Sequence, residues 1–289
     1  MYPPTAYSTH QLEALDFPMP QYAHASLILG EDRSKLSKRH GATSVDQFKQ
    51  QGLLKEAMIN YLAALGWNDG TDKEIYTVGE IVEGFDVERV NSSPSMFDMT
   101  KLKWVNGQHI RGMEPSAIAP MVKEQLAGSE LLLAEEGEDI EEGFVDLAVA
   151  NTQDKIEVLT EAVDLVEEVL GFQFDDTAAS KQGAAIVEDE FGALAAAIVA
   201  AFDAGEMPTG EGGDAEAFEA AWKDWVKALG KSLGRKGKRL FMPIRLAVTG
   251  TMSGGDIGTQ LRLVAAADGV VAPEKVVPLA QRIEKLRAL

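Results

Sequence analysis

The sequence contains no cysteine and only four histidines. The absence of cysteine excludes disulfides, thiolate metal sites and cysteine nucleophiles, and it favours a reducing compartment. We therefore expect neither zinc nor any other metal site built by the protein. No run of about eighteen apolar residues is present either, so we expect no membrane-spanning helix and no membrane partner. The first ten residues lack the charged and then apolar pattern of a secretion signal.

Basic residues are scarce relative to acidic ones, with 27 Lys and Arg against 46 Asp and Glu and a net charge of −19. Such a balance ordinarily argues against a nucleic-acid partner, because phosphate binding depends on cations. The acidity is concentrated, however: residues 124–176 hold 17 acids and the single base Lys155, which sum to −16. We expect those acids to be solvated helix faces, and the remainder of the chain stays available for contact with RNA.

Helix start signals are the clearest local features of the sequence. Ser44 with Gln47, and Thr77 with Glu80, have the spacing of capping boxes, in which each side chain accepts from an otherwise unpaired backbone N–H. Asp98 stands where it can cap a further helix. These signals predict helices beginning near residues 45, 78 and 99.

Apolar spacing extends the helical prediction over most of the chain. Residues 54–65, 156–170 and 218–229 carry apolar side chains at three and four spacing, and Trp222 and Trp225 belong to the last of these stripes. Gly66 stands where a left-handed helix C-cap would lie. The short apolar run from Ala25 to Leu29 predicts one strand, so we expect a mainly α protein.

The segment from Gly30 to Gly41 places four cations between two glycines. Cations on a flexible loop can close on a triphosphate and stabilise the charge that develops on departing pyrophosphate, which makes Lys35 and Lys38 candidates for that role. A Walker A loop is excluded, because Lys35 is followed by Leu36 instead of a hydroxyl residue. A solvated basic loop is the alternative that composition alone leaves open.

The residues Lys35-Leu36-Ser37-Lys38-Arg39 resemble the KMSKS-type signature of class I aminoacyl-tRNA synthetases, in the KLSKR form found in glutamyl-tRNA synthetases of the bacterial and organellar type. The surrounding sequence is also similar to that family. The similar segments are residues 24–32, 40–45, 60–67, 97–104 and, more weakly, 241–250.

The resemblance implies a mainly α chain with the remnant of a Rossmann-type catalytic domain. We expect the end of the catalytic domain with the KLSKR loop at 1–44, a helical stem-contact domain at 45–112, and two all-α anticodon-binding subdomains at 113–204 and 205–289. The family's HIGH-type motif and glutamate pocket have no counterpart in the sequence. We therefore expect a truncated form whose stand-alone activity is doubtful.

The activity implied by the resemblance is glutamate–tRNA ligation, in which ATP with Mg²⁺ activates glutamate before ester transfer to tRNA. The family's catalytic lysines correspond to Lys35 and Lys38, and Ser37 and Arg39 are further candidates for ATP binding. Expected partners are tRNA for glutamate, ATP and glutamate, and the chain is expected to be a monomer. A bacterial cytoplasm, or a chloroplast or mitochondrion in a eukaryote, is the expected location. The alternative is a non-catalytic tRNA-binding module.

Two further groups of basic residues are candidates for tRNA contact, with a solvated surface as the open alternative. The first lies on or after the helix that carries Trp104, a residue that we expect in the core; the second lies in a stretch from 231 to 245 that has six bases and no acid. The candidates are Lys101, Lys103, Arg111, Lys231, Arg235, Lys236, Lys238 and Arg239.

Overall fold

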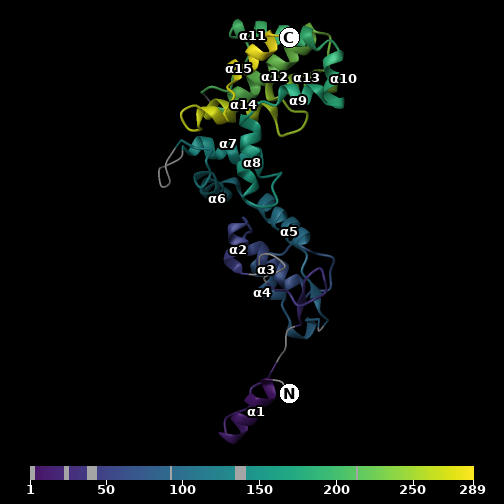
Figure 1. Cartoon of the computed structure of the whole chain (residues 1–289), viewed down its shortest axis with the longest axis vertical. Coiled ribbons are helices and arrows are strands. Elements are labelled where there is room, and N and C mark those ends of the chain that lie inside the picture. The colour runs from purple at the N-terminus through teal and green to yellow at the C-terminus, as the bar shows by residue number, and fades with distance from the viewer. Residues whose placement is uncertain (1–3, 23–25, 38–43, 92, 134–140, 213) are drawn as a thin grey trace.

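The computed structural model describes residues 4–22, 26–37, 44–91, 93–133, 141–212 and 214–289. Over these ranges the protein is elongated, with α1 (Pro4–Ala14) at one end and the carboxyl-terminal helices at the other (Figure 1). The sheet found in them is one parallel pair, formed by β1 (Ile28–Leu29) and β2 (Ser95–Met96). The mainly α fold class is therefore confirmed.

Helices account for nearly all the remaining regular structure of the described residues. Between β1 and the middle of the chain they are α2 (Val45–Gln50), α3 (Lys55–Ala64), α4 (Val78–Gly84), the 3₁₀ turn η2 (Val87–Arg89) and α5 (Met99–Gly112). They continue with α6 (Pro115–Ala127), α7 (Glu142–Thr152), α8 (Glu161–Leu170), α9 (Phe174–Ala179), α10 (Lys181–Glu188), α11 (Phe191–Asp203), α12 (Ala215–Ser232), α13 (Lys238–Thr249), α14 (Ile257–Ala266), η3 (Pro273–Lys275) and α15 (Leu279–Arg287). None of these helices has the length and apolar character that a membrane crossing requires.

The local start signals form as the sequence predicts. Both halves of each capping box are present at α2 and α4, and the Asp98 carboxylate accepts from the backbone N–H of Lys101 at 3.0 Å. The predicted left-handed C-cap at Gly66 is wrong, because Gly66 is not among the residues with positive φ. Instead α3 ends through Leu65 in right-handed conformation, and the amides of Gly66 and Trp67 both bond to the Ala63 carbonyl.

A first core is formed by residues of α2, α3 and α5 to α8 and also includes the end of α14. Asn106 lies fully buried at its centre, where its side chain accepts from the Leu54 amide at 2.7 Å and donates to the Glu157 carbonyl at 2.6 Å. Since one buried amide side chain satisfies backbone groups from α3 and from the loop before α8, it fixes these two segments against α5.

A second core lies among α9 to α15, and Trp222 and Trp225 contribute to it as the sequence predicts. The side chain of Arg282, on α15, is fully buried. Its guanidinium donates to five backbone carbonyls, at 2.8–3.0 Å, which belong to Val169, Leu170, Gly171, Val248 and Val277. Burial lowers the pKa of Arg282 to about 10. The cation thus joins the negative ends of α8 and α13.

Candidate nucleic-acid interface

The first half of the KLSKR segment is held against β1 by backbone hydrogen bonds. Leu29 and Lys35 form an antiparallel bridge, and the Leu36 amide donates to the Ile28 carbonyl at 2.9 Å. Lys35 and Ser37 are exposed, as a group that meets a diffusible nucleotide must be. Lys38 and Arg39, together with the other residues from 38 to 43, lie outside the described residues.

The same strand attaches this loop to the start of α5. β1 pairs in parallel with β2, with Ile28 opposite Ser95 and Leu29 opposite Met96, and the Phe97 amide donates to the Leu29 carbonyl at 2.8 Å. Only two residues separate β2 from α5. The strand that anchors Lys35 is therefore hydrogen-bonded to the segment that leads into α5.

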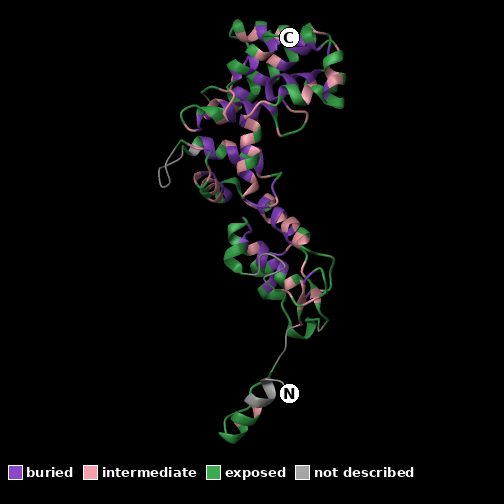
Figure 2. Cartoon of the chain, in the orientation of Figure 1, coloured by how far each residue is buried: buried purple, intermediate pink, exposed green. Residues whose placement is uncertain are grey.

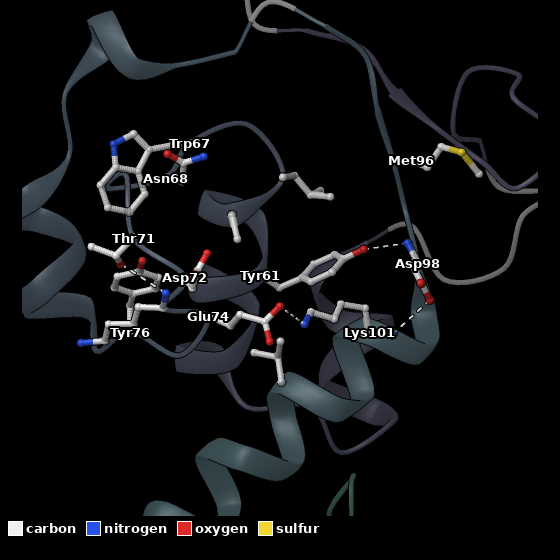
Figure 3. Close-up of a pocket in the computed structure, with 14 residues that line it drawn as sticks. Tyr61, Trp67, Asn68, Thr71, Asp72, Glu74, Tyr76, Met96, Asp98 and Lys101 are labelled. Carbon is white, nitrogen blue, oxygen red and sulfur yellow. Dashed lines mark hydrogen bonds and ion pairs between the residues drawn. The ribbon is translucent and has the colours of Figure 1, made fainter.

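Lys101, the first candidate cation on α5, is engaged within the protein. Its ammonium pairs with Glu74 and lies 4.0 Å from the centre of the Trp104 ring. Figure 3 shows this pair beside a cavity of about 570 Å³, where the Tyr61 hydroxyl points to the Asp98 backbone. Trp104 packs on the first core, as predicted, but stays partly exposed.

The other two cations on α5 are half-buried along the same helix. Arg111 donates to the Ile156 carbonyl at 3.4 Å, so it faces the loop before α8. Lys103 is partly exposed on the same helix. It remains a candidate for RNA contact.

The predicted patch after α12 divides into a structural part and an exposed part. Arg235 is buried and donates to the backbone carbonyls of Asp189 and Arg239. Arg239 forms a two-bond ion pair with the Asp189 carboxylate, at 2.6 and 3.0 Å, and this pair holds the pKa of Asp189 below its ordinary value. Both arginines therefore fasten the α12–α13 turn to the α10–α11 junction. The lysines at 231, 236 and 238 are exposed.

A site that the sequence did not single out lies between α8 and the loop that joins α13 to α14. It is a cavity of about 330 Å³ with one acid among its lining side chains. The residues that line it are Lys155, Leu165, Glu168, Val169, Thr249, Thr251, Ser253, Gly254 and Gln260. We call this the α8–α13 pocket.

Gln260, which lines the α8–α13 pocket, and Asn151, which does not line it, each carry a buried polar atom with no partner among the described residues. Gln260 is 3% exposed and its amide nitrogen makes no hydrogen bond, and the same holds for the side-chain oxygen of Asn151, which is 2% exposed. An unpaired buried donor or acceptor costs about 1–3 kcal/mol. Such a group in a folded protein calls for an explanation, and completion by a water, an ion or a bound ligand is one of them.

Two cations flank these unpaired atoms. The Lys155 ammonium donates to the Asn151 carbonyl at 2.6 Å, and the Arg245 guanidinium donates to the Gly255 carbonyl at 2.6 Å. Partial burial lowers the pKa of Lys155, and the nearby carboxylate of Glu168 opposes this shift in part. Partial burial also lowers the pKa of Arg245, against a smaller opposing effect of Asp256. An anion in the pocket would offset both effects, which favours a phosphate or the carbonyl edge of a base as ligand.

Two glycines let the loop backbone approach these groups. Gly254 has a φ of +135°, and a Cβ on it would lie 2.6 Å from the amide nitrogen of Gln260. A Cβ on Gly255 would lie 3.0 Å from the Lys155 ammonium. The sequence contained one signal for the pocket, because Lys155 is the single base in an otherwise acidic segment. Among the described residues, no three His, Asp or Glu side chains gather as a metal site would require.

Comparison with known families assigns the two parts of the chain. Residues 5–104 match the family described as tRNA synthetases class I (E and Q), catalytic domain, and residues 117–264 match the anticodon binding domain. The α8–α13 pocket lies within the second match. The chain thus combines part of a class I synthetase catalytic domain with an anticodon binding domain.

Individual relatives agree with this class. The chain is 36% identical to a glutamate–tRNA ligase of Natranaerobius thermophilus, and the alignment covers 87% of this chain and 49% of the relative. It is also 36% identical to a glutamate–tRNA ligase of Xanthomonas axonopodis pv. citri, with 90% of this chain and 51% of the relative covered. A solved glutamate tRNA ligase from Elizabethkingia meningosepticum, 22% identical, has the same fold over 98% of this chain and 54% of its own, with a TM-score of 0.69. The protein belongs to the glutamyl-tRNA synthetase family, and it spans about half the length of the relatives it matches.

Proposed function

We propose that this chain serves glutamate–tRNA ligation by holding the anticodon arm of the tRNA in the α8–α13 pocket and by presenting the KLSKR loop to ATP. The observation that carries the proposal is the unpartnered, nearly buried amide of Gln260 between two cations. A flipped nucleotide can supply an acceptor for the Gln260 amide, and its phosphate can add to the negative charge that Glu168 and Asp256 already place near Lys155 and Arg245. The location of the pocket within the anticodon binding domain match supports the same partner.

The proposal includes the cations outside the pocket. Lys103 on α5, and the exposed lysines at 231, 236 and 238, would contact phosphates along the tRNA, and each contact would steepen the salt dependence of binding. Lys35 and Lys38, with Ser37 and Arg39 as neighbours, would stabilise the charge on pyrophosphate as ATP with Mg²⁺ activates glutamate. The exposure of Lys35 on a loop anchored through β1 supports this role.

Replacement of Gln260 by Leu tests the pocket, because it separates binding from stability. Loss of an unpaired buried amide should leave the melting temperature unchanged or raise it, whereas affinity for tRNA for glutamate should fall about tenfold. Lys155→Gln should weaken binding to a similar extent, and Lys181→Gln, at an exposed lysine on α10, is the matched control. Unchanged affinity in both pocket variants would remove the pocket from the interface.

The lowered pKa of Lys155 adds a pH signature to the same assay. Only the protonated ammonium attracts phosphate, so affinity should fall with rising pH before an ordinary lysine, with a pKa of 10.5, would lose its proton. Lys155→Arg keeps the charge and should remove this early decline. The dissociation constant for tRNA is measured between about pH 7 and about pH 10 for the parent chain and for Lys155→Arg. Identical pH profiles in the two proteins would contradict a role for the Lys155 ammonium.

A further inference from the structure

An aromatic ring is exposed near the start of α13. Buried residues concentrate inside the carboxyl-terminal bundle and exposed ones on its outside (Figure 2). Phe241 is 51% exposed, and it is the one aromatic side chain among the large apolar residues that are exposed after residue 105 in the described part of the chain. A single exposed apolar residue is common on protein surfaces, so its surroundings decide what it indicates.

The surroundings of Phe241 in the sequence are basic. Residues 231–245 hold six Lys and Arg and no acid. The two lysines that precede Phe241 most closely, Lys236 and Lys238, are both exposed. An aromatic ring among exposed cations is the combination with which proteins bind unpaired RNA, because the ring stacks on a base and the cations contact its phosphates.

Two acids at the α10–α11 junction lie next to this turn, and both face arginines. Asp189 forms the two-bond ion pair with Arg239, and the Glu190 carboxylate lies 3.7 Å from the Arg235 guanidinium. These arginines offset the two carboxylates, so the exposed lysines remain able to attract phosphate.

The first turns of α13 are held firmly in place. Pro243 has no backbone N–H, so the Arg239 carbonyl has no helical donor, and the buried Arg235 guanidinium donates to it instead at 3.3 Å. Leu240, the neighbour of Phe241, is 5% exposed in the second core. Phe241 is thus displayed on a fixed helix, and an aromatic ring on a fixed element loses little conformational freedom when it stacks on a ligand.

α13 also connects Phe241 to the α8–α13 pocket. Lys238, Phe241, Arg245 and Thr249 follow one another at spacings of three, four and four residues, which places them on one face of the helix. Thr249 lines the pocket, and Arg245 donates to the Gly255 carbonyl in the adjoining loop. Phe241 and Thr249 are about 12 Å apart along the helix, which corresponds to about three or four stacked nucleotides at about 3.4 Å each.

We propose that Phe241 is a stacking platform for an unpaired base of the tRNA, and that Lys236 and Lys238 contact the phosphates beside that base. The inference rests on the proposed function, because the base at Phe241 belongs to the same loop as the nucleotide held in the α8–α13 pocket. The partner is a single-stranded loop, since the bases of a duplex already stack on one another and leave no free face for the ring. Stacking tolerates every base, so Phe241 contributes affinity and the pocket contributes sequence preference.

A fluorescent RNA hairpin tests the stacking directly. The probe is the anticodon arm of tRNA for glutamate, with 2-aminopurine placed in turn at each unpaired position of the loop. The full chain should quench the fluorescence at one position or at two adjacent positions. Phe241→Leu keeps an apolar side chain but removes the ring, so it should abolish this quenching and weaken binding about tenfold. Phe241→Trp should restore both.

Leu133→Ala is the matched control, because Leu133 is also 51% exposed and lies between α6 and α7. It should leave the quenching and the affinity unchanged. Quenching that persists in Phe241→Leu, or an affinity that this variant retains, overturns the stacking. Unchanged RNA binding together with loss of a self-associated form in sedimentation velocity also overturns it, because Phe241 would then contact a second copy of the chain.

The pocket variant Gln260→Leu, measured with the same hairpin, separates this inference from the proposed function. If Gln260→Leu weakens binding and Phe241→Leu does not, the pocket stands and the stacking fails. If only Phe241→Leu weakens binding, the stacking stands and the pocket leaves the interface. Failure of the parent chain to bind the hairpin at all would overturn both proposals.

Discussion

The part of the chain before residue 105 and the part after it differ in how many of their large apolar side chains are exposed. Of the 18 large apolar side chains exposed in the described residues, 14 precede residue 105 and 4 follow it. The later part buries its apolar residues in two cores, the second of which is made entirely from residues 172–286. The earlier part adds α2, α3 and the start of α5 to the first core and buries a small cluster of Trp67, Tyr76 and Ile81, but it leaves most of its other large apolar side chains exposed.

This difference indicates that the two parts obtain their stability from different sources. The later part is stabilised by contacts among its own residues, including the buried guanidinium of Arg282, which joins α15 to the ends of α8 and α13. The earlier part depends on its junction with the later one, where Gly52 packs on Leu159 and the Leu54 amide donates to the Asn106 side chain. Substitutions in each part and at the junction can therefore show whether the parts unfold separately.

Replacement of Arg282 by Met should have the largest effect and should be confined to the later part. Removal of the guanidinium leaves five buried carbonyls without their donor, so we expect a loss of about 3–5 kcal/mol in the free energy of unfolding. Urea denaturation gives the magnitude. Hydrogen exchange of amides in α8, α13 and α15, compared with α3, gives the location.

Lys285→Met is the matched control for that experiment, because Lys285 lies on the same helix but its ion pair with Asp175 is exposed. It should change stability by less than about 1 kcal/mol. If Arg282→Met accelerated exchange in α3 as strongly as in α8, the two parts would unfold as one cooperative unit, and the comparison between them would fail.

Gly52→Ala should have the next largest effect, at the junction. Gly52 has a φ of +80°, and a Cβ there would lie 2.7 Å from the backbone nitrogens of Leu159 and Thr160. Gly70→Ala is the matched control, since Gly70 has a φ of +86° with nothing within 4 Å of the added atom. Left-handed strain should cost about 1 kcal/mol in both variants, and the clash should add about 1–3 kcal/mol in Gly52→Ala alone. Equal losses of unfolding free energy in the two variants would mean that the backbone at the junction shifts to accommodate the added methyl group without loss of stability.

The features that could be predicted from the sequence are those determined by residues close together in the sequence. The capping boxes at Ser44 and Thr77 need only a partner three residues away, and the stripe that contains Trp222 needs only a helical period. The backbone anchoring of Lys35 depends in contrast on pairing between residues 28 and 95, and a local pattern shows no such partner. The KLSKR resemblance gave the family without giving this geometry.

The features that the sequence missed arise where distant segments meet. The burial of Arg282 requires the ends of two other helices, 34 and 112 residues away in the sequence, which no local pattern shows. The α8–α13 pocket combines Lys155 with Gln260 across a similar separation. α14 itself contributes to both cores, so residues 257–266 could not have been assigned to either from apolar spacing alone.

Thr77→Ala should have the smallest effect and should stay within the earlier part. The substitution removes the side-chain acceptor of the Glu80 amide at the start of α4, which should cost about 1 kcal/mol. Because α4 packs on a small cluster of Trp67, Tyr76 and Ile81 outside the two cores, the loss should appear as roughly fivefold faster hydrogen exchange in α4 and nowhere else.

Asp256→Ala removes the equivalent cap from α14, where Asp256 accepts from the Thr259 amide at 2.9 Å. Since α14 is shared by both cores, that variant should accelerate exchange throughout the later part, and a purely local response in both variants would show that α14 does not couple the cores.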